Sequence, residues 1–354
     1  MRLGRIPVET IGVGAVLAAV LLAIPLVTDQ FYTFQFANVA IFVIALIGLN
    51  VLTGYSGQIS LGNGAFMAVG GYTTALLARR YFAVPYWVTV PLGGLLAGFA
   101  GYLFGLPALR LRGIYLALAT FALALSLTPV LNNFDSFTGG HAGIVLHPVA
   151  PPTFLDLSQE QWLYFVCWAI AIGLYIPAWL MVRARTGRAW MAVRDSETAA
   201  IASGISLPYY KTLAFAISAF YAGIAGSLQV IANSYINPDG YGLALSLQLL
   251  IGIVLGGLGL TWGPVFGGLI VVWLPYLAER AGGIHLGSLV IPQKPDIGFG
   301  VLLILIVFFA SNGVAGLLER GVRRYRVWRR VTRGVPAAAA AAEAEIAPVV
   351  GAEE

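Results

Sequence analysis

Charged residues are scarce in this sequence, and their scarcity excludes an ordinary soluble fold. Only 10% of the 354 residues are Asp, Glu, Lys or Arg, and 59% are hydrophobic, whereas an average soluble domain carries roughly 25% charged residues. Apolar runs near the ~20 residues needed to cross a bilayer recur along the whole chain. They lack the alternating pattern of barrel strands, so the sequence predicts an all-α polytopic membrane protein.

Cysteine and histidine are also rare. The single cysteine, Cys167, excludes an intramolecular disulfide and a thiol metal cluster, and its apolar surroundings predict a packing role. The three histidines, His141, His147 and His285, show no H-E-x-x-H or comparable spacing and fall in predicted loops. We therefore expect no metal site and no cofactor.

Groups that could power transport are missing as well. A phosphate-binding P-loop needs G-x-x-x-x-G-K-[ST], but the only lysines, Lys211 and Lys294, follow Tyr210 and Gln293. No ionisable residue falls in the middle of a predicted span, which disfavours a proton-driven pump. Paired carboxylates, metal spacing and a nucleophile with a nearby base are all absent, which disfavours a membrane-embedded enzyme. If the chain takes part in powered transport, a partner must supply the energy.

About ten apolar segments are candidate membrane spans. They cover residues 11–28, 36–53, 61–78, 86–108, 113–131, 161–181, 212–234, 243–259, 264–278 and 297–318. The first is expected to be a retained helix, because no small-residue cleavage site follows it. These spans make one transmembrane domain over residues 1–333. The alanine- and glutamate-rich tail, residues 334–354, is expected to be disordered.

The basic residues give the predicted orientation. If the N-terminus is cytoplasmic, the outside holds only Arg79, Arg80, Arg280 and Lys294 of the 20 Lys and Arg residues. The inside then holds the other 16, namely Arg2, Arg5, Arg110, Arg112, Arg183, Arg185, Arg188, Arg194, Lys211, Arg320, Arg323, Arg324, Arg326, Arg329, Arg330 and Arg333. The positive-inside rule therefore predicts that both termini are cytoplasmic. This placement explains the net charge of +5 without nucleic acid as a partner.

Three connections between spans are longer than a turn requires. The outside segments 132–160 and 279–296 are expected to hold short interfacial helices. The inside segment 182–211 is the one sizeable cytoplasmic loop.

One stretch rich in glycine and polar residues interrupts the apolar pattern. Residues 54–72 read GYSGQISLGNGAFMAVGGY, and a second, similar interruption at residues 256–268 reads GGLGLTWGPVFGG. Lipid cannot satisfy freed backbone groups, so such breaks should be shielded by protein or line a polar cavity. We expect a translocation path here, lined by Ser56, Gly57, Gln58, Ser60 and Asn63. Close helix packing alone is the alternative reading of these glycines.

The cytoplasmic loop predicts a short exposed helix. It reads RARTGRAWMAVRDSETAAIASGISLPYYK over residues 183–211. Asp195 or Ser196 can cap the helix, Glu197 lies in its first turn and Gly204 can end it. The small side chains of TAAIAS suit docking into a groove on another protein. A plain amphipathic connector is the alternative.

Four stretches together resemble a known family. They are GRAWMAVRDSETAAIASGISLPYYKTLAFAISAFYAGIAGSL (187–228), GLNVLTGYSGQISLGNGAFMAVGGY (48–72), LPALRLRGIYLALATFALAL (106–125) with FTGGHAGI (137–144), and VLGGLGLTWGPVFGG (254–268). They are similar to the LivM-like permease subunits of branched-chain amino acid ABC importers, in that family's order along residues 36–318.

The resemblance implies a partner set and a location. It implies a sister permease, two cytoplasmic ATPase subunits and a periplasmic solute-binding protein, all at the bacterial inner membrane. Arg183, Arg185 and Arg188 would contact membrane lipid, where anionic headgroups attract each by on the order of 1 kcal/mol.

The resemblance also implies site residues. The ATPase-coupling surface would comprise Asp195, Glu197, Ala199, Ala200 and Gly204, and the path would extend to Thr138, Gly139 and Gly140. Gly204 stands one residue further from Glu197 than in the general importer pattern, and an asparagine often found after the TGG run is absent.

Two rival functions remain open at this point. The same architecture could import urea, short amides or aromatic acids instead of branched-chain amino acids. The chain could also be a stand-alone channel or facilitator, although a channel has no need of an ATPase-docking helix.

Overall fold

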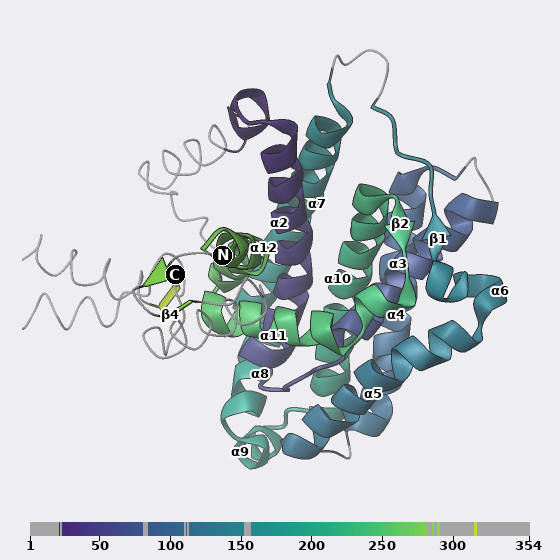
Figure 1. The fold of residues 1–354 in the computed structure, drawn as a ribbon. Helices are drawn as coiled ribbons and strands as arrows, with labels where there is room; N and C mark the ends of the chain where they lie inside the picture. Colours follow the sequence, from purple (N-terminus) through teal and green to yellow (C-terminus); the bar gives the residue numbers. More distant parts are fainter. Residues whose placement is uncertain are drawn as a thin grey trace, which may run out of the picture.

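The computed structural model describes residues 21, 23–80, 84–109, 111, 113–151, 157–281, 285–286, 289–290 and 315–316. Over these residues the chain is mostly helical (Figure 1). The long helices are α2 (Gln30–Leu49), α3 (Asn63–Arg80), α4 (Tyr86–Ala108), α5 (Ile114–Asn133), α7 (Gln159–Arg183), α10 (Leu207–Asn233), α11 (Leu243–Gly256) and α12 (Gly263–Ala281). The shorter helices are the π-helix η1 (Asn50–Tyr55), α6 (Asp135–Thr138), the 3-10 turn η2 (Gly140–Ala142), α8 (Arg185–Asp195), α9 (Glu197–Ala202) and the 3-10 turn η3 (Pro238–Tyr241).

Helix α10 is the centre of the bundle. It packs against α2, α3 and α4, and its buried face consists largely of small residues. A Cβ on Gly70 of α3 would lie only 2.5 Å from the Gly223 Cα of α10, so the two backbones are in contact. The Ser227 hydroxyl donates to the Gly70 carbonyl at 3.0 Å. Small residues allow this close approach, which replaces the hydrophobic driving force that lipid does not provide.

Eight of the ten predicted spans correspond to described helices, namely α2, α3, α4, α5, α7, α10, α11 and α12. Of the predicted spans 11–28 and 297–318, the structure describes only residues 21, 23–28 and 315–316. Six described segments are long and apolar enough to cross a membrane: Gln30–Tyr55, Tyr86–Pro107, Ile114–Asn133, Gln159–Arg183, Leu207–Asn233 and Pro238–Gly256. The chain is therefore polytopic, and the count of ten stays a prediction.

Helix α11 differs from a simple span. It has 14 residues, or about 21 Å at 1.5 Å per residue. In Figure 1 it runs nearly horizontally, at a large angle to the upright helix α2. Helix α12 then follows α2 closely, because Gly268 lies against Val43 and the indole of Trp273 stacks on Tyr32.

Two very short strand pairs accompany the helices of this mostly helical fold. Strand β1 (Ile144–Val145) pairs antiparallel with β2 (Tyr235–Ile236), with Ile144 opposite Ile236, and β3 (His285–Leu286) pairs with β4 (Leu289–Val290). Strands of two residues are too short to produce the alternating pattern by which strands are predicted. The β1–β2 pair ties the segment after α5 to the end of α10. That segment, predicted as 132–160, does contain the short helices α6 and η2.

Other sequence predictions fall on residues that are not described. Most of the predicted outside segment 279–296 and all of the tail 334–354 lie outside the described residues.

Two helices begin at least five residues before their predicted starts. Helix α2 begins at Gln30 instead of residue 36, and α10 begins at Leu207 instead of residue 212. Pro208 lies in the first turn of α10, where its missing N–H removes no helical hydrogen bond. Consequently Lys211, which the sequence placed in a loop, lies inside α10 and is only 6% exposed.

Candidate functional site

The first glycine-rich stretch breaks the helix as predicted. Helix α2 passes into the π-helix η1, which ends at Tyr55, and α3 starts only at Asn63. Gly57 has a φ of +72°, a conformation that side chains other than glycine rarely adopt. Between the helices the chain runs alongside α10. Gln58 Nε2 donates to the Lys211 carbonyl, and Ser218 Oγ donates to Asn63 Oδ1, both at 3.4 Å.

The second glycine-rich stretch also breaks the chain, between the end of α11 at Gly256 and the start of α12 at Gly263. The structure brings the two breaks into contact. Asn50 Oδ1 accepts from Gly259 N at 2.8 Å, and Asn50 Nδ2 donates to the Leu260 carbonyl at 2.9 Å. A Cβ on Gly54 would lie 2.5 Å from Gly259 N. Asn50 therefore supplies the hydrogen bonds that lipid could not.

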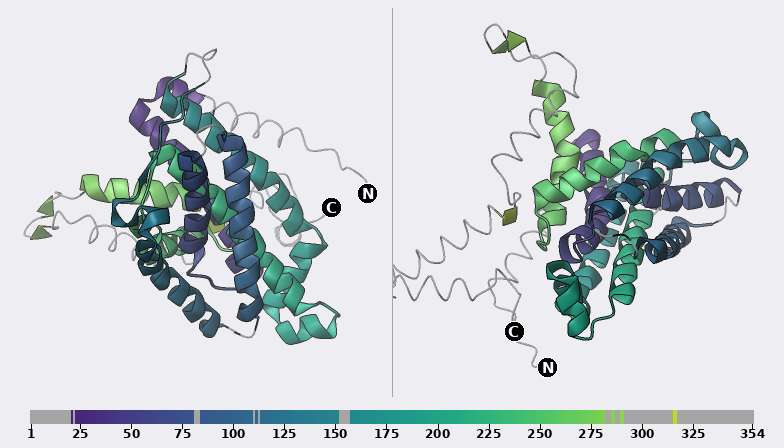
Figure 2. Two further views of the ribbon diagram at one scale, coloured as in Figure 1. Left: turned by 90° about the vertical axis from the view of Figure 1, so that its right-hand side faces the viewer. Right: turned by 90° about the horizontal axis from the view of Figure 1, so that it is seen from below.

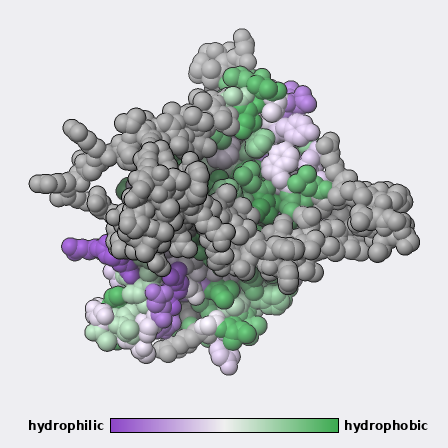
Figure 3. Space-filling view, turned by 90° about the vertical axis from the view of Figure 1, so that its left-hand side faces the viewer, coloured by the Kyte–Doolittle hydropathy of each residue, from purple (hydrophilic) through white to green (hydrophobic). Residues whose placement is uncertain are grey.

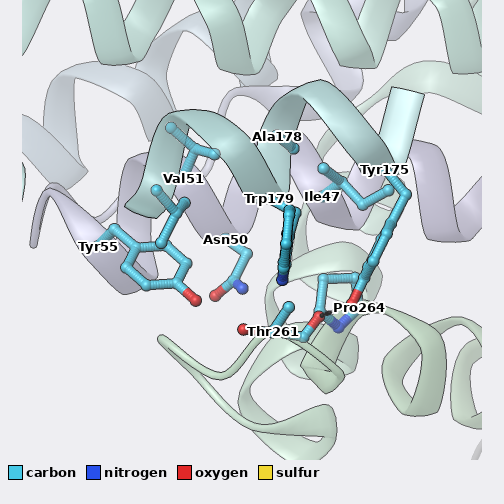
Figure 4. Close-up of a pocket in the computed structure, with 10 residues that line it drawn as sticks. Ile47, Asn50, Val51, Tyr55, Tyr175, Ala178, Trp179, Thr261 and Pro264 are labelled. Carbon is cyan, nitrogen blue, oxygen red and sulfur yellow. Dashed lines mark hydrogen bonds between the residues drawn. The ribbon is translucent and has the colours of Figure 1, made fainter. Parts of the chain in front are cut away.

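Asn50 was not singled out from the sequence. The available signal was a polar amide within the otherwise apolar predicted span 36–53. Figure 4 shows its side chain with Tyr55, Trp179 and Thr261 around a small cavity between η1, α7 and the second break. The cavity measures about 20 Å³, which is enough for about one water molecule.

Arg194 connects this pair of breaks to the cytoplasmic helices. It lies in the last turn of α8, and its Nη1 donates to the Gly54 carbonyl at 2.9 Å. Its side chain also runs across Gly57, where a Cβ would lie 2.6 Å from Arg194 Cγ, and its Nη1 lies 3.3 Å from the Cβ position of Gly259. The guanidinium thus contacts both glycine breaks at once. The sequence had placed Arg194 only as one of the basic loop residues.

A second polar link joins α9 to α10. Lys211 Nζ lies 2.5 Å from Glu197 Oε1, and the side chain of Lys211 is 8% exposed. The same region encloses a cavity of about 200 Å³. Its lining includes Ser56, Gly57, Gln58, Arg194, Asp195, Glu197 and Lys211. A buried lysine in this position needs its carboxylate partner, because an unpaired buried charge is strongly destabilising.

The polar residues predicted for the path lie together but are closed off. Relative exposure is 2% for Ser56, 6% for Gln58, 1% for Ser60 and 0% for Asn63. Helix α5 lies against the end of this segment, where Thr120 Oγ1 accepts from Leu61 N at 3.0 Å. In this conformation only Ser56, Gly57 and Gln58 of these residues reach the 200 Å³ cavity.

The other predicted path residues, Thr138, Gly139 and Gly140, lie past the far end of α5. Gly139 adopts a φ of +74° and ends α6. The Thr138 hydroxyl donates to the Leu131 carbonyl at 2.8 Å and accepts from Gly140 N at 3.1 Å. These hydrogen bonds form a local turn, and the structure does not bring the turn into the cluster around Ser56 and Asn63.

The predicted coupling residues lie in α9 or within two residues of its ends. Ser196, rather than Asp195, caps the helix by accepting from Ala199 N at 3.3 Å, and Gly204 follows its end with a φ of +79°. Asp195, Ala199 and Gly204 are exposed, Glu197 is partly buried in its ion pair, and Ala200 is buried at 2% exposure. Ile201 is an exposed apolar residue on α9, 55% exposed, that the sequence did not single out.

Helices α8 and α9 form one end of the molecule. They lie together at the lower end in Figure 1 and remain side by side in both views of Figure 2. Figure 3 shows a hydrophilic patch in the lower half of its face, with hydrophobic side chains beside and below it. The Arg183 guanidinium stacks over Trp179 at 3.9 Å. Trp and Arg side chains are typical of the interface between a membrane and water.

Comparison with known proteins gives a family model and several relatives. Residues 31–310 match the family model described as the permease component of a branched-chain amino acid transport system. The high-affinity branched-chain amino acid transport system permease protein LivM of Escherichia coli (strain K12) is 35% identical over 257 residues, which cover 66% of this chain and 60% of LivM. The autoinducer 2 import system permease protein LsrC of Escherichia coli O9:H4 (strain HS) is 24% identical over 326 residues, or 90% of this chain and 92% of LsrC.

LivM of Salmonella typhimurium (strain LT2) matches with the same identity and coverage as its Escherichia coli counterpart. The matched part of this chain therefore spans about 60% of the length of these LivM proteins. No solved structure matches this chain.

Proposed function

Because the chain belongs to the family of permease components of branched-chain amino acid transport systems, we propose that it is a transmembrane subunit of an ATP-driven importer. In this proposal it forms, with a sister permease, the path for branched-chain or related hydrophobic amino acids. Two cytoplasmic ATPase subunits supply the energy and a periplasmic solute-binding protein delivers the cargo. The chain lies in a bacterial inner membrane with both termini in the cytoplasm.

The observation that carries the proposal is the contact between Arg194 and Gly54. Helices α8 and α9 form a compact unit at the end of the bundle, and Arg194 joins that unit to the carbonyl of the helix break. A partner that moves α9 therefore also moves the segment from Gly54 to Asn63. Rigid-body movement of a short helix is an established way to pass a conformational change to packed neighbours.

The exposed face of α9 is the proposed ATPase contact. It presents Ala199 and Ile201, and the exposed Gly204 follows its end, whereas Ala200 is buried and Glu197 is held by Lys211. Thus Glu197 and Ala200 fix α9 to the permease, and the small exposed residues fit the groove of the partner. The loop 182–211 consists mainly of α8, α9 and the first turn of α10, a structure that a stand-alone channel would not need.

The path residues are neutral, and this suits release of cargo better than tight capture. Ser56, Gln58, Ser60 and Asn63 offer hydroxyl and amide groups with no fixed charge. Most of the selectivity would then belong to the solute-binding protein.

Replacing Ala199 by Trp is expected to abolish ATP-driven uptake, because a bulky ring on the exposed face of α9 blocks docking. Ala142→Trp is the matched control, since Ala142 is also exposed but lies in η2, far from α8 and α9. The measurement is co-purification of the ATPase subunits together with uptake of labelled leucine by cells expressing the complete set of subunits.

Both variants should reach the membrane at the wild-type level, and only Ala199→Trp should lose the ATPase. Full ATPase recovery and uptake with Ala199→Trp would contradict the docking assignment. Competition of leucine uptake by valine and isoleucine, but not by urea, short amides or aromatic acids, is the result expected for the proposed cargo.

A further inference from the structure

Helix α3 begins inside the bundle instead of at a membrane surface. Its first residue, Asn63, lies beside Ser218, which is the twelfth of the 27 residues of α10. A helix N-terminus carries about half a positive charge and several N–H groups without partners in the helix itself. With 18 residues, α3 is long enough for this effect, and its N-terminus faces neither water nor lipid headgroups.

Three N–H groups at this terminus donate to hydroxyl groups, whereas Ala65 N and Phe66 N donate to the Gly62 carbonyl. Leu61 N donates to Thr120 Oγ1 of α5 at 3.0 Å, and Gly64 N donates to Ser246 Oγ of α11 at 2.9 Å. Gly62 N donates to the nearby Ser60 Oγ at 3.3 Å. Two of the three acceptors therefore come from other helices, and they leave if those helices move.

The two hydroxyl groups on other helices have alternative partners on their own helices. Thr120 Oγ1 also lies 3.0 Å from the Ala117 carbonyl and 3.2 Å from the Leu116 carbonyl, and Ser246 Oγ lies 3.5 Å from the Gly242 carbonyl. Movement of α5 or α11 thus leaves these hydroxyls bonded but frees Leu61 N and Gly64 N. A movement of these helices therefore leaves unpaired N–H groups at the α3 terminus, which is unfavourable unless a new acceptor binds there.

Asn63 adds an independent sign of a missing ligand. Its side chain is 0% exposed, and Nδ2 has no hydrogen-bond partner among the described residues. A buried polar group without a partner typically costs about 1–3 kcal/mol. The unused donor lies at the same terminus as the N–H groups of residues 61, 62 and 64.

We propose that the N-terminus of α3 binds the α-carboxylate of the amino acid during its passage. The carboxylate oxygens replace Thr120 and Ser246 as acceptors and take the unused hydrogen bond of Asn63. This assignment rests on the proposed function, since it requires a substrate that carries a carboxylate. Broken membrane helices recognise anionic groups in this way because their dipole and N–H groups point at the ligand.

The test is Asn63→Asp in proteoliposomes that contain the complete importer and its solute-binding protein. Asp has nearly the same shape as Asn and suits a helix N-terminus, so α3 should be retained. A fixed negative charge should repel the carboxylate and lower the maximal rate of leucine uptake at least about tenfold, the factor that corresponds to ~1.4 kcal/mol. The neutral variant Asn63→Ser, which keeps a donor, should lower the rate less than Asn63→Asp does.

Asn38→Asp is the matched control, because Asn38 lies in α2 and donates to its own helix at Phe34 O. It should transport leucine like the wild type. Wild-type uptake of leucine in Asn63→Asp, or an equal loss in both Asp variants, would overturn the carboxylate site. If Asn63→Asp fails to assemble, Asn63→Val decides instead, and an unchanged rate in that variant overturns the proposal. Absence of leucine uptake by the wild-type complex is a separate outcome, which refutes the proposed function itself.

Discussion

Arg194→Met is expected to reduce ATP-driven uptake about tenfold or more while the complex still assembles. Arg194 donates a charged hydrogen bond to the Gly54 carbonyl at 2.9 Å, and such bonds contribute about 1.5–3 kcal/mol. Methionine keeps most of the apolar stem that lies across Gly57 but loses the donor. The first glycine-rich stretch would then no longer move together with α8, so ATP hydrolysis should continue with little uptake. The measurement is the ratio of transported leucine to hydrolysed ATP in proteoliposomes.

Arg188→Met provides a control within the same helix. Arg188 is exposed, and its Nη1 donates to the Arg183 carbonyl at 3.3 Å, within the α7–α8 junction. The two variants lose the same charge from α8, but only one loses a contact with the breaks. A coupling ratio for Arg194→Met equal to that of Arg188→Met would show that Arg194 does not transmit the movement.

Gly70→Leu is expected to prevent the chain from folding into a stable bundle. A Cβ at this position would collide with the backbone of Gly223 at 2.5 Å from its Cα. Overpacking of a core typically costs about 1–3 kcal/mol when side chains can adjust. Here the obstacle is backbone, and Gly70 also bonds Ser227 and lies against Gly93 of α4. Helices α3, α4 and α10 would all have to separate.

The same substitution at Gly173 separates this effect from a general intolerance of leucine. Gly173 lies in α7, and its Cβ position has nothing within 4 Å. Gly173→Leu should match the wild type in yield, in size-exclusion profile and in melting temperature in detergent. A monodisperse Gly70→Leu protein with the wild-type melting temperature would show that close contact of α3 and α10 is not needed.

The breaks were predictable because their cause is local. Glycines and small polar residues clustered inside apolar runs weaken a helix wherever they occur, and residues 54–64 and 256–268 both contain such a cluster. The short helix of the coupling loop was also predictable, since Glu197 and Gly204 mark its ends. The sequence left Asp195 and Ser196 as candidates for the N-cap, and the structure shows that Ser196 is the cap.

The contacts between distant segments could not be predicted in the same way. Asn50 bonds Gly259 across 209 positions, and Arg194 bonds Gly54 across 140 positions. No local pattern encodes such pairs, because they arise when α8 and the α11–α12 connection meet the end of α2. The burial of Lys211 was missed for a related reason. Its partner Glu197 stands 14 residues earlier, and only the fold of α9 against α10 brings the two together.

The most direct test of the central claim is leucine accumulation in proteoliposomes with and without the ATPase subunits. In the proposed function this chain is a gate, and a nucleotide-hydrolysing partner moves it through α8 and α9. With the sister permease, the solute-binding protein, the ATPase subunits and ATP present, leucine should accumulate against its gradient. ATP should drive no accumulation when the ATPase subunits are left out. ATP-dependent accumulation of equal size in their absence would contradict the account.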